Sequence, residues 1–153
     1  MTRKEKAIEL FMNGANCAQA VLVAFADLCG LDEKTAYRLS APFGGGFGRQ
    51  REVCGAVSGM CMVLGFLYGY DDLTDLPAKA EHYRVVQALC GAFKERFGSI
   101  VCRELLAGVQ TTKGGDPEQR TPEYYAKRPC PQLVALAADV LDEFLREKDA
   151  VHN

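Results

Sequence analysis

The sequence predicts an all-α fold, in which residues 1–153 form a single compact domain of about six to seven helices. Apolar residues recur among charged ones at the spacing of an amphipathic helix, most clearly in residues 4–13 and 131–148. Residues that start and stop helices separate these stretches, and no strand-like alternation of useful length is present. The length of 153 residues suits one domain, and 48% hydrophobic with 25% charged residues is an ordinary globular composition.

Capping residues define where the expected helices begin and end. Asn16, followed by Gln19 three residues later, has the pattern of a capping box at a helix start. Gly30 suits the left-handed residue that ends a helix, whereas Asp32 and Ser99 suit helix caps. The helices expected over the chain span residues 4–13, 17–28, 33–40, 52–68, 77–98, 100–107 and 131–148.

The segments between these helices are expected to be irregular. Residues 43–51 form a glycine-rich loop, and residues 108–129 form a long polar loop that Tyr124 and Tyr125 anchor to the core. Residues 53–70 carry no charge and approach the length of a membrane span, but four glycines interrupt the run. We therefore expect a buried central helix there and no membrane association.

The charge balance excludes several classes of function. The net charge is −2, whereas a nucleic-acid-binding surface normally carries a basic excess. The first ten residues carry charges of both signs and lack the apolar core of a secretory signal. We therefore expect a cytoplasmic protein that binds no nucleic acid and whose cysteines are mostly reduced.

Four of the seven cysteines fall at expected helix N-termini. These helix-start cysteines are Cys17, Cys54, Cys102 and Cys130. The partial positive charge and the free N–H groups at a helix start both favour thiolate over thiol. Because 36, 47 and 27 residues separate them, only the tertiary fold could assemble one site from them. Thiolates attack disulfides and coordinate metals, so these four are the candidate redox thiols and the candidate metal ligands.

The other three cysteines lie elsewhere in the expected helices. Cys61 and Cys90 lie inside helices, and Cys29 lies at a helix C-terminus, where the dipole disfavours a thiolate. Free cysteines commonly serve as small apolar residues in a core, which is the role we expect for these three. Neither of the two histidines lies at ligand spacing from a thiol or a carboxylate.

The segment around the second helix-start cysteine reads Glu52-Val-Cys54-Gly55-Ala56-Val-Ser-Gly59. Together with the other three helix-start cysteines, it resembles the signature of a known family. The family is a group of redox-active proteins of bacteria and archaea, named for a Cys…Gly-Cys-Ala-x-x-Gly…Cys…Cys pattern. The resemblance covers nearly the whole chain and implies a small helical protein whose four helix-start cysteines form a redox or metal centre. The chain departs from the pattern in reading Cys-Gly-Ala where the family name has Gly-Cys-Ala, whereas the Ala-x-x-Gly portion matches.

Two residues near Cys54 are candidate cofactor contacts. Arg49 lies in the glycine-rich loop and could hold negative charge near Cys54, and Gly55 adjoins that cysteine. Gly55 and Gly59 lie four residues apart on one helix face, so we also expect a second helix to pack closely there.

Three hypotheses of function follow. In the first, the chain is an oxidoreductase or electron carrier, with a redox partner that the sequence does not identify. Its four-cysteine centre then holds an iron–sulfur cluster or works as cycling dithiols. In the second, the same cysteines hold a structural zinc ion. In the third, the chain is a non-catalytic helical homodimer whose cysteines belong to the core, with no cofactor.

Overall fold

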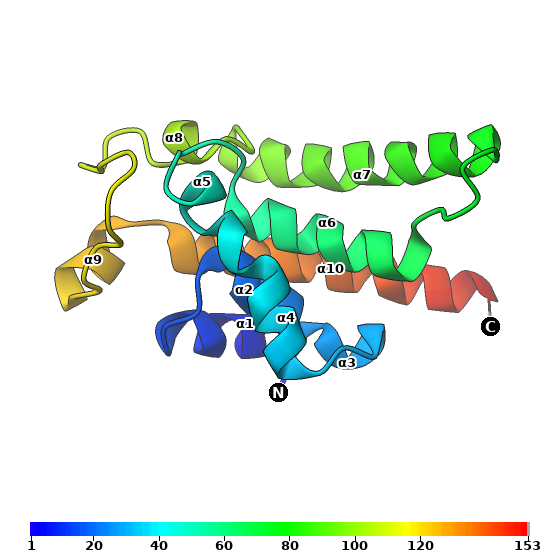
Figure 1. The fold of residues 1–153 in the computed structure, drawn as a ribbon, viewed down its shortest axis with the longest axis horizontal. Helices are drawn as coiled ribbons and strands as arrows, with labels where there is room; N and C mark the ends of the chain where they lie inside the picture. Colours follow the sequence, from blue (N-terminus) through cyan, green and yellow to red (C-terminus); the bar gives the residue numbers. More distant parts are fainter. Residues whose placement is uncertain (153) are drawn as a thin grey trace.

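Helices make up the fold, and the computed structural model describes residues 1–152, with side chains up to residue 149. The helices in chain order (Figure 1) are α1 (Arg3–Met12), α2 (Cys17–Ala24), α3 (Ala26–Cys29), α4 (Glu33–Ser40), the 3-10 helix η1 (Ala41–Phe43), α5 (Gly44–Phe47), α6 (Gly55–Tyr68), α7 (Leu76–Phe97), α8 (Cys102–Leu105), α9 (Pro122–Lys127) and α10 (Cys130–His152). Six of them have eight or more residues: α1, α2, α4, α6, α7 and α10. Within residues 1–152 no strand is present, and a single isolated antiparallel bridge joins Val53 to Val101. The all-α prediction is confirmed.

Capping residues delimit the N-terminal helices as predicted. Asn16 accepts a hydrogen bond from the Gln19 N–H, and the Gln19 side chain accepts one from the Asn16 N–H, so the predicted capping box is present. Gly30 is left-handed, with a φ of 66°, and ends α3. The Asp32 carboxylate accepts a hydrogen bond from the first turn of α4. The structure differs in one respect, because the second predicted helix is divided at Phe25 into α2 and α3.

α2 lies at the centre of the helical packing. It packs against α6, α1 and α4, while α10 packs on α1 and also contacts α2 and α6. α7 runs along α6 and α10 on the side away from α1, and the short helices α5, α8 and α9 lie toward one end of the molecule (Figure 1). The largest fully buried side chains include Phe11, Phe25, Phe93, Met60 and Leu141.

Two glycines let α6 approach α2 closely. A Cβ at Gly59 would lie 2.7 Å from the carbonyl oxygen of Ala18. A Cβ at Gly55 would lie 2.9 Å from the carbonyl oxygen of Phe43 and 3.2 Å from the Cβ of Cys17. The predicted packing role of this helix face is confirmed, and the close approach sets the starts of α2 and α6 side by side.

α6 is the uncharged helix of the sequence, and half of its 14 residues are buried. It contacts α2, α7 and α10, as expected for a central helix. Among the helices of residues 1–152, none is both long enough and apolar enough to cross a membrane.

Two helix starts near the cysteines differ from the prediction. α6 begins at Gly55 rather than at residue 52, because Val53 takes part in the isolated bridge. The predicted cap at Ser99 is wrong: the cap of α8 is Val101, and the Ser99 hydroxyl accepts a hydrogen bond from the Val101 N–H at 2.9 Å. α8 is consequently a single turn of four residues.

The predicted polar loop 108–129 is not wholly irregular, because α9 interrupts it. The Thr121 side chain caps α9 by accepting a hydrogen bond from the Tyr124 N–H at 3.2 Å. The Tyr125 ring packs edge-on against Phe11, with 6.1 Å between ring centroids. The predicted anchoring of this segment to the core is therefore confirmed at Tyr125.

Candidate redox site

The four helix-start cysteines line one cavity. The cavity has a volume of about 60 Å³ and is also lined by three arginines, at positions 51, 120 and 128, and by Tyr124. Cys17 is half-buried, and the other three helix-start cysteines are buried. The fold thus brings together all four residues that the sequence puts forward as the site.

Each of these cysteines stands at a helix start, as predicted. Cys17, Cys102 and Cys130 are the first residues of α2, α8 and α10. Cys54 is the N-cap residue of α6. Four chain segments that are distant in sequence therefore direct their helix N-termini toward one cavity.

A short stretch of paired backbone holds Cys54 beside Cys102. The Cys54 N–H donates to the carbonyl oxygen of Ile100 at 2.8 Å, and the Cys102 N–H donates to the carbonyl oxygen of Glu52 at 2.5 Å. These bonds flank the isolated bridge between the two segments. Because α6 carries the chain away from Cys54 and α7 brings it back, the spacing in the sequence does not predict this contact.

Cys17 and Cys130 both line the cavity, and a hydrogen bond between their thiols shifts the two pKa values in opposite directions. This bond raises the pKa of Cys17 well above its ordinary value, and burial adds to the increase. The same bond lowers the pKa of Cys130, because the Cys17 thiol donates to the Cys130 sulfur. Burial opposes the lowering at Cys130, and the arginines of the cavity support it.

Burial outweighs the helix-start effect at the other two cysteines. It raises the pKa of Cys54 to about 12, and the N–H groups of Val57 and Ala56 offset only part of that shift. It also raises the pKa of Cys102, although Arg51 Nη1 lies 3.9 Å from the Cys102 sulfur and opposes the increase. The predicted preference for thiolate is therefore wrong at both positions, because desolvation disfavours the charged form. It is also wrong at Cys17, whose pKa is raised.

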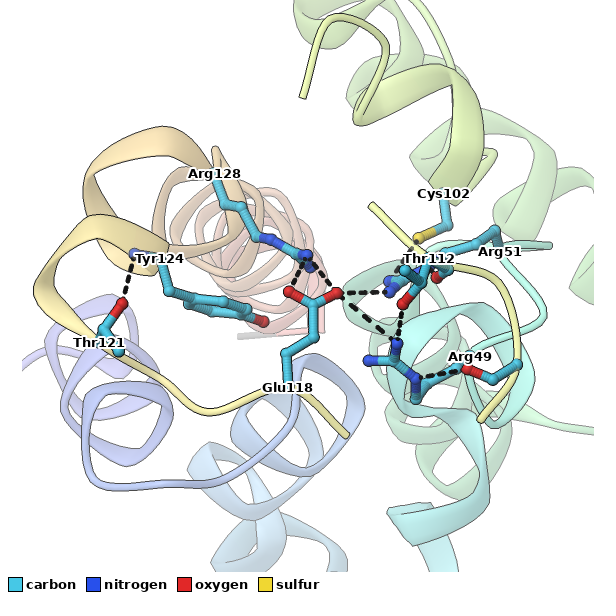
Figure 2. A network of polar contacts seen from close by, with 9 residues as sticks. Arg49, Arg51, Cys102, Thr112, Glu118, Thr121, Tyr124 and Arg128 are labelled. Atoms are coloured by element: carbon cyan, nitrogen blue, oxygen red, sulfur yellow. Dashed lines mark hydrogen bonds and ion pairs between the residues drawn. The ribbon is translucent and has the colours of Figure 1, made fainter. Parts of the chain in front are cut away.

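Glu118 forms ion pairs with three arginines beside the cavity (Figure 2). Its carboxylate oxygens lie 2.7 Å from Arg128 Nη2, 3.6 Å from Arg49 Nη2 and 3.7 Å from Arg51 Nη2. Arg51 and Arg128 are each only 6% exposed. Burial raises the pKa of Glu118, but the arginines outweigh it and hold that pKa below its ordinary value.

The glycine-rich stretch positions Arg51. Gly46 is left-handed, with a φ of 68°, and a Cβ there would lie 2.7 Å from the Glu52 nitrogen and 2.9 Å from the Arg51 Cα. The Arg51 N–H donates to the carbonyl oxygen of Gly45 at 3.0 Å, and its Nε donates to that of Thr112, also at 3.0 Å. Position 46 therefore has to be glycine for Arg51 to reach the cavity along this path.

The other two cavity arginines are held by aromatic rings. Arg120 lies over the Phe11 ring at 4.3 Å and donates to the carbonyl oxygens of Phe11 and Ala15 at 2.6 and 2.8 Å. Arg128 lies over the Tyr124 ring, also at 4.3 Å. These contacts fix two guanidinium groups near Cys130 in addition to Arg51.

The two predicted cofactor contacts are placed differently. Gly55 lines the cavity, whereas Arg49 faces Glu118 in a neighbouring groove. Their cofactor roles stay predictions. Sequence reasoning missed Glu118 and Arg128, and only the position of Arg128 two residues before Cys130 could have pointed to it.

The arrangement of the thiols also bears on metal binding. Among residues 1–149, whose side chains the structure describes, no group of three or more histidine, cysteine, aspartate or glutamate side chains is gathered closely enough to hold a metal ion. Four cysteines are the usual protein ligands both of a structural zinc ion and of an iron–sulfur cluster. Both the zinc and the iron–sulfur hypotheses stay predictions.

Comparison with known proteins defines the family. A family described as "Putative redox-active protein (C_GCAxxG_C_C)" matches residues 15–144, which include all four helix-start cysteines. The chain belongs to this family. The resemblance read from the sequence is confirmed. The assignment of the motif to the four cysteines that line the cavity stays a prediction. No curated protein and no solved structure matches the chain.

The Glu118→Gln variant of this C_GCAxxG_C_C protein is expected to be less stable. Glutamine removes the negative charge that faces two buried guanidinium groups, so the free energy of unfolding should fall by about 1–3 kcal/mol. Urea unfolding followed by circular dichroism measures this change. The matched control is Glu81→Gln, because the Glu81–Arg84 pair is exposed and should contribute no more than about 0.5 kcal/mol. Equal losses in the two variants would contradict a structural role for Glu118.

Proposed function

We propose that the protein is a thiol–disulfide oxidoreductase in which Cys130 is the attacking thiolate and Cys17 is the resolving thiol. The observation that carries the proposal is the cavity that Cys17 and Cys130 line together with three arginines. The hydrogen bond from Cys17 and the arginines lower the pKa of Cys130, so this cysteine is the one most populated as thiolate among the four. Thiolate is the nucleophilic form of cysteine.

The reaction is an exchange of two electrons with a disulfide substrate. The Cys130 thiolate attacks one sulfur of the substrate, so that a mixed disulfide forms and one substrate thiolate leaves. Cys17 then loses its proton and attacks the Cys130 sulfur, which releases the second substrate thiolate. The protein ends with a Cys17–Cys130 disulfide, and the substrate has been reduced to two thiols. A compartment that keeps thiols reduced, such as the cytoplasm, would maintain the starting dithiol.

The surrounding residues support these steps. Arg128, Arg120 and Arg51 stabilise the negative charge on Cys130 before the attack and on the leaving thiolate after it. Cys54 and Cys102 stay protonated near neutral pH because burial raises their pKa values. In this account they form the inner wall of the cavity and are not the first nucleophiles.

An iron–sulfur cluster is the second candidate, and one observation favours it. Four cysteines face a single cavity together with three arginines, which would compensate the negative charge of four thiolates and a cluster. Cys17, Cys54, Cys102 and Cys130 would hold the cluster, which when bound would supply one-electron transfer. The arginines would then act by stabilising the anionic ligand set.

Anaerobic purification separates the two candidates. The protein is purified without oxygen and analysed for iron, acid-labile sulfide and zinc, and its free thiols are counted after mild oxidation. The oxidoreductase account predicts no stoichiometric metal and the loss of two thiols per chain. Stoichiometric iron and sulfide that disappear from the Cys54→Ser variant would establish the cluster instead.

Removal of the Cys17 thiol is expected to raise the pKa of Cys130. In a Cys17→Ala variant the donor that lowers this pKa is gone, while burial, which raises it, remains. The thiolate fraction of Cys130 near neutral pH should therefore fall, and its alkylation by iodoacetamide should follow a pH profile displaced to higher pH. Peptide mass spectrometry assigns the rate to Cys130, and Cys29→Ala, which changes a buried cysteine outside the cavity, is the control. A profile that moves to lower pH, or stays in place, would show that Cys17 is not the donor.

A further inference from the structure

A groove lined by four arginines adjoins the cavity of the four cysteines. The groove has a volume of about 380 Å³, against about 60 Å³ for the cavity. Six residues line both hollows and form a shared wall: Asn16, Gly45, Arg51, Arg120, Tyr124 and Arg128. Pockets that hold small molecules measure roughly 300–1000 Å³, so the cavity is too small for a whole substrate. The body of a substrate therefore lies outside the cavity, and the groove is an adjoining space of suitable size.

Positive charge is concentrated in this groove. Among the described residues that line it, Glu118 is the one carboxylate, whereas four are arginines, at positions 49, 51, 120 and 128. The chain as a whole has a net charge of −2, so the excess of positive charge is a local feature. A hollow lined by charges of one sign concentrates ligands of the opposite sign. The groove should therefore attract an anion.

Glu118 occupies one of the four guanidinium groups and leaves others open to a further ligand. Both of its oxygens accept hydrogen bonds from Arg128 Nη2, at 2.8 and 2.7 Å. Its ion pairs with Arg49 and Arg51 are longer, at 3.6 and 3.7 Å, and exceed hydrogen-bond distance. Arg51 Nη2 is buried and has no hydrogen-bond partner among the described residues. Because a buried charged donor without an acceptor is costly, the groove is suited to a second oxygen ligand beside Glu118.

The backbone holds Arg49 and Arg51 in a conformation that favours glycine. Their φ angles are 71° and 62°, in the left-handed region. Each Nε donates to a backbone carbonyl oxygen at 3.0 Å, that of Gly114 for Arg49 and that of Thr112 for Arg51. Figure 2 shows both side chains directed toward Glu118 from the side opposite Arg128. Glycine would relieve the strain at either position but could not supply a guanidinium group, and strain of this kind is typical of functional sites.

We propose that the groove is a carboxylate-binding subsite, which holds a carboxylate group of a small disulfide substrate beside the cavity. Arg128 already binds the carboxylate of Glu118, and the planar fork of an arginine matches the two oxygens of such a group. Arg49 and Arg51 bind the substrate carboxylate. Arg51 Nη1 also lies 3.9 Å from the Cys102 sulfur, so this residue connects the groove with the thiols. The disulfide part of the inference rests on the proposed function, whereas carboxylate binding does not.

Suberate measures the binding step apart from thiol chemistry. It is dithiodipropionate with both sulfurs replaced by methylene groups, so it keeps the two carboxylates but cannot react. Calorimetric titration of the reduced native protein should show saturable binding that weakens with added salt. Octanediol, the uncharged counterpart, should bind at least about tenfold more weakly, because it makes no charged hydrogen bond. Suberate that binds no better than octanediol would overturn the proposal.

Two variants should shift the affinity for suberate in opposite directions. Arg49→Gln removes a charge from the groove, changes no residue that lines the cavity, and should weaken binding about tenfold. Glu118→Gln removes the carboxylate that competes with the ligand and should strengthen binding. Arg84→Gln is the matched control, because Arg84 also pairs with a glutamate but lies on α7, outside the groove. An affinity that neither groove variant changes would overturn the proposal, and Glu118→Gln alone decides the test if Arg49→Gln does not fold.

Disulfide selectivity connects the subsite with the reaction. The reduced native protein is mixed in single turnover with dithiodipropionate and with the uncharged hydroxyethyl disulfide. The rate that remains in Cys130→Ser is subtracted, and each result is divided by the rate of free mercaptoethanol with the same disulfide. The normalised rate should be about tenfold higher for dithiodipropionate, and this preference should shrink in Arg49→Gln but not in Arg84→Gln.

The two measurements distinguish failure of the subsite from failure of the proposed function. Reduction of both disulfides without a preference for dithiodipropionate would overturn the subsite and leave the oxidoreductase standing. Suberate binding that depends on Arg49, with no reduction of either disulfide, would support the carboxylate site and overturn the oxidoreductase.

Discussion

Replacement of Cys130 by serine is expected to abolish the reduction of disulfides by the cavity cysteines. Serine keeps the size of the side chain but cannot supply a thiolate, and burial still raises the pKa of Cys17, the remaining cysteine of the pair. We expect the rate to fall by roughly 1000-fold or more, as when an activated nucleophile is removed from an enzyme. The measurement is the single-turnover release of glutathione from its disulfide by the pre-reduced protein.

The matched control is Cys29→Ser, which removes a buried cysteine that does not line the cavity. This control should keep the rate of the native protein. A Cys130→Ser protein that releases glutathione as fast as the control would remove Cys130 from the reaction.

The Gly59→Ala variant is expected to be destabilised at the contact between α2 and α6. The added Cβ would lie 2.7 Å from the Ala18 carbonyl oxygen and 3.0 Å from the Val21 Cβ, and both belong to a buried helix. Overpacking of this kind costs about 1–3 kcal/mol in the free energy of unfolding. The melting temperature should fall by about 2–4 °C for each kcal/mol lost in a chain of this size. Because Ala18 follows Cys17, the contact between Cys17 and Cys130 should also loosen.

Gly65→Ala is the matched control for this variant. Gly65 lies on the same helix, but no atom stands within 4 Å of the new Cβ. Alanine should therefore raise the free energy of unfolding by about 0.5–1 kcal/mol, the usual gain over glycine within a helix. Urea unfolding of the two variants should give changes of opposite sign. A stabilised Gly59→Ala protein would mean that α6 does not approach α2 this closely.

Local signals in the sequence predicted most of the fold. Asn16, Gly30 and Asp32 delimit helices through bonds and backbone angles that depend only on residues nearby. The start of α6 was predicted three residues too early, because Val53 pairs with a segment that lies beyond α7. The cap of α8 was misplaced for the same reason, since non-local pairing decides where that helix begins.

The members of the site were predictable, but their chemistry was not. The four cysteines carry a signal because the sequence places each of them at or near a helix start, although non-local pairing fixes where α6 and α8 begin. The pKa values depend on burial and on which thiol donates to which, and neither can be read from spacing. Glu118 and Arg128 lie in the polar segment 108–129, where the sequence shows no helical periodicity. Their ion pair near Cys130 therefore depends on the tertiary fold.

The most direct test of the account is a redox titration of the native protein in anaerobic glutathione buffers, with the disulfides mapped at each potential. The account predicts that one cavity disulfide appears, that it joins Cys17 to Cys130, and that Cys54 and Cys102 stay reduced at the same potentials. A titration in which Cys54 and Cys102 oxidise together while Cys17 and Cys130 remain free thiols would contradict it.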